Sequence, residues 1–185
     1  MKRTFIAIDI PLESGIVGQI YELKAEFVNE KIKWVNPDQH HITIQFLGNV
    51  ENSDIDRINE SLSKITGNFS KFSLELTEFG VFKNLYNPRV FWIGFKPCDD
   101  LVLLQKIVAD EMYRYGFEKP DKPFSPHLTI ARIKMLKNSH KLKEIIDQYK
   151  GKVLQVIEVG EIILYESILK PQGPEYKVIK KHLLS

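Results

Sequence analysis

Two stretches with the same pattern constrain this chain more than any other feature of its sequence. Residues 41–44 read His-Ile-Thr-Ile, and residues 127–130 read His-Leu-Thr-Ile. Polar and apolar side chains that alternate with a period of two are typical of a half-buried β-strand. The histidine and threonine of each stretch then share one face, and the two apolar residues point toward a core. Each stretch therefore predicts a strand that presents one imidazole and one hydroxyl side by side.

Chance is a poor explanation of the repeat. With five His among 185 residues and as many Thr, a random order gives about 0.14 His-x-Thr spacings. The alternative is two ordinary strands that each carry a polar face, but the apolar positions match as well. The second histidine follows the first by nearly half of the chain. We therefore expect two similar lobes, each of which contributes one His-Thr strand.

The length of 185 residues fits one domain or two small lobes that share a core, and the composition is ordinary for a globular protein. The chain is 43% apolar and 27% charged, with a net charge of +2 and a pI of about 8.5. Such a weak positive charge predicts that any polyanion is recognised at a local site. One cysteine, Cys98, excludes an intrachain disulfide and favours a reducing compartment. The apolar runs are too short for a secretory signal or a membrane span, so we expect a cytoplasmic protein.

Hydrophobic periodicity predicts an α+β fold with antiparallel sheets. Connections between neighbouring strands are too short for parallel crossovers. We expect one bilobal domain over residues 1–185, with helices on the outer faces and the two His-Thr strands facing each other across a central cleft. The boundary between the lobes is expected near residues 95–100, with crossing allowed for the terminal strands. The expected helices are 13–29, 53–65, 99–115 and 139–149, and the expected strands are 4–10, 32–35, 41–47, 72–82, 89–95, 127–135, 153–165 with a break at Gly160, and 176–179.

Two facing imidazoles can divide acid and base chemistry between them. Histidine titrates near pH 6.5, so a neutral ring can take a proton from water while a charged ring gives one to a leaving oxygen. Adjacent hydroxyls can donate hydrogen bonds to oxygens that gain charge. This set suits in-line displacement at phosphorus. A metal site is the chemical alternative, but neither motif offers a third ligand at the required spacing. No nucleophile elbow and no phosphate-binding glycine loop accompany the motifs.

Other polar and aromatic residues are harder to interpret. Arg132 lies five positions after His127 and is a candidate phosphate clamp, since its guanidinium matches phosphate oxygens. Strict alternation would turn Arg132 away from the cleft, and a bend or bulge after Thr129, or the length of the side chain itself, would return it. A surface arginine is the alternative interpretation. We interpret His40 as structural and expect solvated side chains at residues 140 and 182, which are also histidines. Five aromatic residues are candidates to stack on a base, although most are expected in the core: Trp34, Phe46, Phe79, Phe82 and Trp92.

With these motifs, the chain resembles the two-histidine (2H) phosphoesterases. Within them it is most similar to the RNA 2′,3′-cyclic phosphodiesterases, which are also called 2′-5′ RNA ligases. The resemblance covers nearly the whole chain, and the paired motifs are its most specific part. The similar segments are residues 5–9, 34–35, 40–48, 79–82, 88–90, 126–132, 164–167 and 173–176.

The resemblance implies a bilobal LigT-like fold and opening of a 2′,3′-cyclic phosphate at an RNA end to a 2′-phosphate, without a metal or other cofactor. It implies His41 as proton donor and His127 as proton acceptor, with Thr43, Thr129 and Arg132 holding the phosphate. Spacing alone does not decide which histidine is the acid.

The resemblance also implies that the reverse reaction, ATP-independent 2′-5′ RNA ligation, uses the same site. RNA ends, with tRNA fragments among them, are the expected partners of a monomeric protein. Two alternatives stay open, namely an RNA-end binding module without turnover and a phosphodiesterase for small cyclic nucleotides. The role of Gln45 is left open.

Overall fold

The structure, a computed structural model, describes residues 1–119, 122–171 and 173–185. The elements follow the order that the periodicity predicts, with ends that differ by a few residues. The largest difference is the last strand, which is much longer than expected. The helices are α1 (Ser14–Glu26), α2 (Asn52–Thr66), α3 (Asp99–Arg114) and α4 (Ser139–Tyr149), with a short 3-10 helix η1 (Pro37–Gln39). The strands are β1 (Lys2–Asp9), β2 (Lys31–Trp34), β3 (His41–Val50), β4 (Phe72–Phe82), β5 (Val90–Phe95), β6 (Leu128–Met135), β7 (Gln155–Val159), β8 (Glu161–Lys170) and β9 (Gly173–Leu183).

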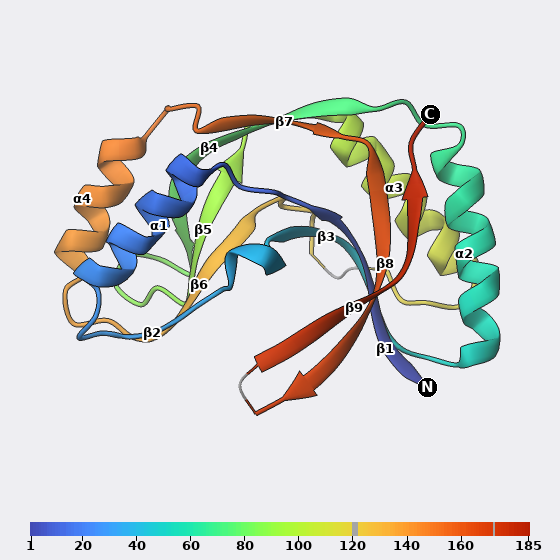
Figure 1. The fold of residues 1–185 in the computed structure, drawn as a ribbon, viewed down its shortest axis with the longest axis horizontal. Helices are drawn as coiled ribbons and strands as arrows, with labels where there is room; N and C mark the ends of the chain where they lie inside the picture. The colour runs from blue at the N-terminus through green and yellow to red at the C-terminus, as the bar shows by residue number, and fades with distance from the viewer. Residues whose placement is uncertain (120–121, 172) are drawn as a thin grey trace.

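The strands form two antiparallel sheets, as the α+β prediction requires. The first sheet has four strands in the order β3-β1-β8-β9, and the second has five in the order β2-β6-β5-β4-β7. One His-Thr strand lies in each sheet, because β3 belongs to the first and β6 to the second. Figure 1 shows the two sheets joined by the chain that runs from β7 into β8. The two lobes of antiparallel sheet expected from the sequence are therefore confirmed.

The sheets do not divide the chain at its middle. We expect a lobe boundary near residues 95–100, yet β5 ends at Phe95 and pairs directly with β6 beyond that segment. The second sheet also takes β2 from the beginning of the chain, and the first sheet takes β8 and β9 from its end. The physical reason is strand pairing: α3 connects two neighbours within one sheet and does not link two sheets.

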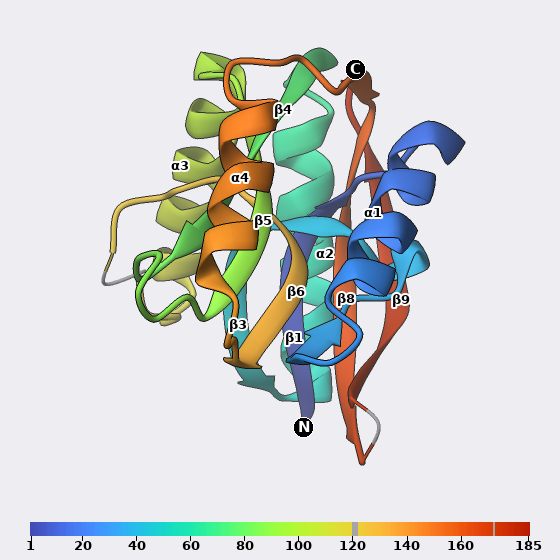
Figure 2. The ribbon, with the colours of Figure 1, turned by 90° about the vertical axis from the view of Figure 1, so that its left-hand side faces the viewer.

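Each sheet has its own pair of covering helices. Helices α2 and α3 pack against the first sheet, since α2 contacts β8 and β9 and α3 contacts β3. Helix α4 packs on β4 of the second sheet, and α1 lies beside α4 (Figures 1 and 2). Apolar stripes at helical spacing explain these contacts, such as the one formed in α3 by Leu101, Leu104 and Val108, which are all buried. The faces of the sheets that the helices do not cover are left to build a cleft.

Candidate active site

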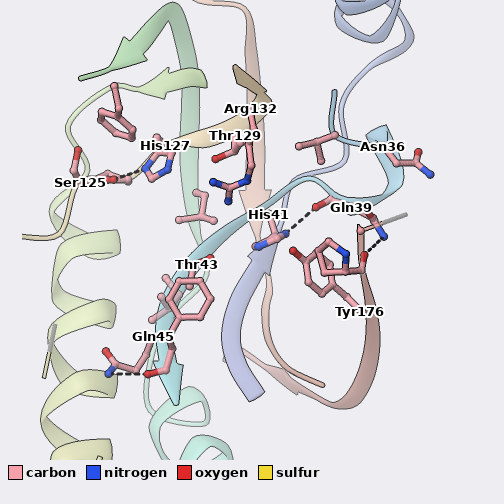
Figure 3. Close-up of a pocket in the computed structure, with 18 of the residues that line it drawn as sticks. Asn36, Gln39, His41, Thr43, Gln45, Ser125, His127, Thr129, Arg132 and Tyr176 are labelled. Atoms are coloured by element: carbon pink, nitrogen blue, oxygen red, sulfur yellow. Dashed lines mark hydrogen bonds between the residues drawn. The ribbon is translucent and has the colours of Figure 1, made fainter. Parts of the chain in front are cut away.

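The two His-Thr strands line one cleft between the sheets. Its volume is about 1220 Å³, and its walls include His41 and Thr43 from the first sheet and His127, Thr129 and Arg132 from the second. Figure 3 shows both imidazoles and the guanidinium of Arg132 directed into the same space. The structure therefore brings together all five residues that the sequence singles out, although they come from positions far apart in the chain.

Each motif histidine is restrained by an equivalent hydrogen bond to a backbone carbonyl two residues earlier. His41 Nδ1 lies 2.8 Å from the carbonyl oxygen of Gln39, and His127 Nδ1 lies 2.8 Å from that of Ser125. A carbonyl oxygen can only accept, so Nδ1 carries the hydrogen in each ring. The neutral form of each imidazole then has its lone pair on Nε2. Each histidine is thus held through Nδ1, which leaves Nε2 for another partner.

Aromatic rings hold the two imidazoles in place. The His41 ring packs against Phe5 and Tyr176, each with a centroid separation of 5.2 Å. The His127 ring meets Phe82 edge to face at 4.6 Å. Such contacts restrict ring rotation and remove water from one side of each imidazole. They add Phe82 and Tyr176 to the site, with Tyr176 coming from β9, the strand whose length the sequence underestimates.

Burial is the main electrostatic influence on both rings. Burial lowers the pKa of His41, while the Gln39 carbonyl and the Asp9 carboxylate oppose that effect. Burial likewise lowers the pKa of His127, opposed by the Ser125 carbonyl, and Arg132 lowers it further. Desolvation disfavours the charged ring in both cases. At neutral pH the site is therefore biased toward two neutral imidazoles.

A β-bulge brings Arg132 into the cleft. Phe91 of β5 pairs with Ala131, but its neighbour Trp92 pairs with Thr129, so Ile130 is an extra residue in β6. The extra residue changes the alternation, and the side chains of residues 130 and 131 are both buried. Arg132 consequently shares a face with Thr129, which is the outcome that a bulge after Thr129 predicts.

The first sheet contains the equivalent bulge. Ala7 of β1 pairs with Thr43 and Ile6 pairs with Gln45, which leaves Ile44 as the extra residue. Phe46 therefore stands in β3 where Arg132 stands in β6, five positions after the motif histidine. Its side chain is 66% exposed and lines the cleft. One wall of the cleft thus offers a guanidinium and the other an aromatic ring.

Gln45 points away from the motif face. Its side-chain amide donates to the carbonyl oxygens of Phe46 and Glu118, at 3.3 and 3.0 Å. Its Oε1 is buried and has no partner among the described residues. These bonds tie β3 to the segment after α3, so Gln45 supports the wall of the cleft.

Of the three histidines outside the motifs, one departs from expectation. His40 is 3% exposed and lies outside the motif face, as its interpretation as a structural residue predicts. His182 is 2% exposed, so the expectation of a solvated side chain is wrong. Its ring bonds to Ser63 and Asn59 of α2, because β9 runs beneath that helix. His140 is exposed, as expected.

Most of the candidate stacking residues belong to the core or its edge. Phe79 is buried, while Trp34, Phe82 and Trp92 are half-buried. Trp34 and Phe82 line the cleft together with Phe46. Periodicity could not separate these cases, because position relative to the bulge decides the face on which a side chain lies.

Two kinds of feature are absent from the part of the chain that the structure describes. In residues 1–119, 122–171 and 173–185, no cluster of three or more His, Cys, Asp or Glu side chains is arranged to hold a metal ion. In the same part of the chain, no helix has the length and apolar character needed to cross a bilayer.

Comparisons with known proteins identify the family of this chain. A family model described as LigT-like phosphoesterase matches residues 10–92 and 94–176, so each matched stretch contains one motif. The chain is 37% identical to an RNA 2′,3′-cyclic phosphodiesterase of Methanocaldococcus jannaschii, covering 97% of this chain and 99% of that one. It is 34% identical to a protein of the same description from Archaeoglobus fulgidus, covering 96% and 98%.

A solved structure supports the same assignment. The crystal structure of E. coli LigT complexed with 3′-AMP superposes with a TM-score of 0.74 at 26% identity, covering 100% of this chain and 98% of that one. The match spans both sheets and the cleft between them. The chain belongs to the LigT-like phosphoesterases of the two-histidine superfamily.

Proposed function

We propose that this protein is an RNA 2′,3′-cyclic phosphodiesterase that opens the cyclic phosphate to a 2′-phosphate. The observation that carries the proposal is the matched pair His41 and His127, each held through Nδ1 with Nε2 left for the ligand, in one cleft. The relatives described as RNA 2′,3′-cyclic phosphodiesterases support the choice of substrate. The two sheets act as one domain, because the proposed site takes residues from both.

In this reaction His127 is the base and His41 is the acid. The Nε2 of His127 takes a proton from water as the water oxygen attacks phosphorus, and the bond from phosphorus to the 3′ oxygen breaks. The Nε2 of His41 gives its proton to that leaving oxygen, so proton uptake and release balance. Thr43 and Thr129 donate hydrogen bonds to the phosphoryl oxygens, whose negative charge Arg132 also stabilises.

The proposed chemistry uses side chains alone. Both proton transfers are assigned to imidazoles and the charge on the phosphoryl group to Arg132, so no metal has a role in it. When the ribose 5′ hydroxyl of a second RNA replaces water, the same groups take its proton as it attacks phosphorus and give a proton to the leaving 3′ oxygen, which joins the RNA ends through a 2′-5′ linkage without ATP. A monomer is sufficient, because all the proposed groups come from one chain.

The substrate is RNA with a cyclic phosphate end, and tRNA fragments are one source of such ends. The cleft volume of about 1220 Å³ exceeds that of most small-ligand sites, which favours a polynucleotide over a free mononucleotide. Lys33, Lys122 and Arg132 line the cleft and match the charge of phosphates. The competing function is a phosphodiesterase for small cyclic nucleotides, and comparing the kcat/KM of both substrates separates the two.

The test is hydrolysis of a 2′,3′-cyclic-phosphate oligonucleotide in the presence of EDTA. His41→Ala and His127→Ala should each lower the rate about 10²–10⁴-fold, because each removes one proton-transfer group. His140→Ala is the matched control, since that side chain is exposed and distant from the motifs. Tight binding without product would identify a binding module instead, and loss of activity in EDTA would contradict the metal-free mechanism.

A further inference from the structure

A carboxylate lies beside only one of the two motif histidines in the described structure. Asp9, the last residue of β1, is paired with His41 in the antiparallel register of β1 and β3. Directly opposite residues on one face have Cβ atoms about 4.5–5.5 Å apart. The aspartate is fixed there by Tyr165 of β8, whose hydroxyl donates to both carboxylate oxygens at 2.7 Å. The charge of Asp9 is therefore held next to the imidazole.

The second sheet lacks an equivalent group on the neighbouring strand. Ile93 of β5 pairs with Leu128, and the next residue of β5 is Gly94, which has no side chain. Among the described residues, the groups that influence the proton on His127 are the Ser125 carbonyl and Arg132, with no carboxylate. The two motifs thus differ in the residue of the neighbouring strand that lies beside the histidine, which is Asp9 in the first sheet and Gly94 in the second.

The charged groups around His41 come from several elements. Asp9 of β1 favours the protonated ring, whereas Arg132 of β6 and His127 disfavour it. Tyr176 of β9 contacts the ring edge, and its hydroxyl stays protonated because burial raises its pKa. Asp9 is consequently the carboxylate that opposes the positive charge of Arg132 at this imidazole.

We propose that Asp9, held by Tyr165, is a positioning residue that places the shared proton on His41 and leaves His127 neutral before the reaction. The consequence for catalysis rests on the proposed function: it makes His41 the acid and His127 the base, a choice that the spacing of the motifs does not make. Asp9 is also exposed to solvent, because it lines a second cavity of about 720 Å³. Water there weakens the field of the carboxylate, so we expect moderate effects.

The direct test measures the proton on each ring and needs no activity. NMR titration of the ring protons of His41 and His127 in the wild type and in Asp9→Asn should show a lower pKa for His41 in the variant, with the pKa of His127 not lowered. Glu161→Gln is the matched control, because that carboxylate lies on β8 and pairs with Lys181. An unchanged pKa of His41, or an equal fall at both histidines, would overturn the proposal even if the protein hydrolyses RNA.

The second test is the pH–rate profile of the hydrolysis. The acid must be protonated, so a lower pKa of His41 moves the alkaline limb to lower pH. Asp9→Asn should lose about three- to tenfold in rate on the alkaline side and keep the wild-type acid limb. Asp9→Glu should restore part of the loss, and Glu161→Gln should keep the wild-type profile. An equal loss at every pH would show a structural role and contradict the proposal.

Discussion

The two motif strands place different side chains at equivalent positions, Arg132 in β6 and Phe46 in β3. Arg132 is the residue that the bulge in β6 turns into the cleft. A lysine there keeps the charge but not the planar pair of donors that matches two phosphoryl oxygens. We expect Arg132→Lys to lower kcat/KM by about ten- to a hundredfold. Arg57→Lys is the control, since Arg57 is exposed on α2, and an equal effect of both changes would contradict a role for the guanidinium.

Phe46 presents an exposed aromatic ring on which a base of the RNA can stack, so it should contribute to substrate binding more than to the chemical step. Its exposed ring rests against Phe5, with centroids 5.9 Å apart, and so offers one free face to the cleft. Stacking of a base on an aromatic ring contributes about 1–3 kcal/mol. Phe46→Ala should raise KM for an oligonucleotide by about tenfold or more while kcat changes little. Phe46→Tyr keeps the stacking surface and should behave like the wild type, and a loss confined to kcat would refute this role.

At the scale of elements, His182 joins β9 to α2 and makes stability depend on pH. Burial lowers the pKa of His182 to about 4, whereas the unfolded chain titrates near the usual value. Between those values the unfolded state binds the proton and the folded state does not, so stability falls as pH falls and is fully present above the unfolded pKa. The expected loss from this one group between pH 7 and pH 5 is about 2 kcal/mol.

Urea unfolding at both pH values measures that loss. His182→Gln should unfold more easily at pH 7, because it disturbs the bonds to Asn59 and Ser63, but its stability should depend less on pH. His140→Gln should keep the wild-type dependence, as its side chain is exposed. His40, with a pKa lowered by burial to about 4, retains its own contribution in both variants. An unchanged slope in His182→Gln would contradict this account.

The pairing of β4 with β5 brings Gly80 close to the indole ring of Trp92. Gly80 pairs with Trp92, and a Cβ at Gly80 would lie 2.2 Å from an atom of the indole ring. Trp92 packs on Phe82, which in turn contacts His127. Gly80→Ala should therefore lower the free energy of unfolding by about 1–3 kcal/mol and disturb the support of His127. Thermal unfolding measures this, with Gly15→Ala as control, since no atom lies within 4 Å of a Cβ there. Equal stability of both variants would show that Trp92 moves freely.

How far the sequence predicts these elements depends on the range of the interactions involved. Alternation and helical spacing are local, so they correctly place most helices and strands and predict the face shared by His41 and Thr43. Strand partners depend on contacts between residues that are distant in sequence. Local patterns therefore could not predict that β5, which ends at Phe95, pairs with β6, which begins at Leu128. The contacts of Tyr176 and the burial of His182 follow from the full length of β9, which local alternation does not define.

At the scale of the whole molecule, the site exists only because each sheet draws strands from both halves of the chain. The second sheet needs β2, β4 and β5 from the first half together with β6 and β7 from the second. The first sheet needs β8 and β9 beside β1 and β3. Neither half of the chain can therefore complete a sheet or bury the apolar face of its helices, despite the repeat that the two motifs display.

Division of the chain between Pro97 and Cys98 tests this interdependence. Fragment 1–97 would leave β1 without β8 and β5 without β6, exposing unpaired strand edges and apolar faces that are buried in the intact protein. We expect neither fragment 1–97 nor fragment 98–185 to unfold cooperatively in circular dichroism, while the intact chain does. Mixing the fragments should restore β-structure in proportion to their association. Cooperative unfolding of either fragment alone would show that one motif repeat folds independently. The pairing of strands from both halves would then not be required for folding, which would contradict the interdependence.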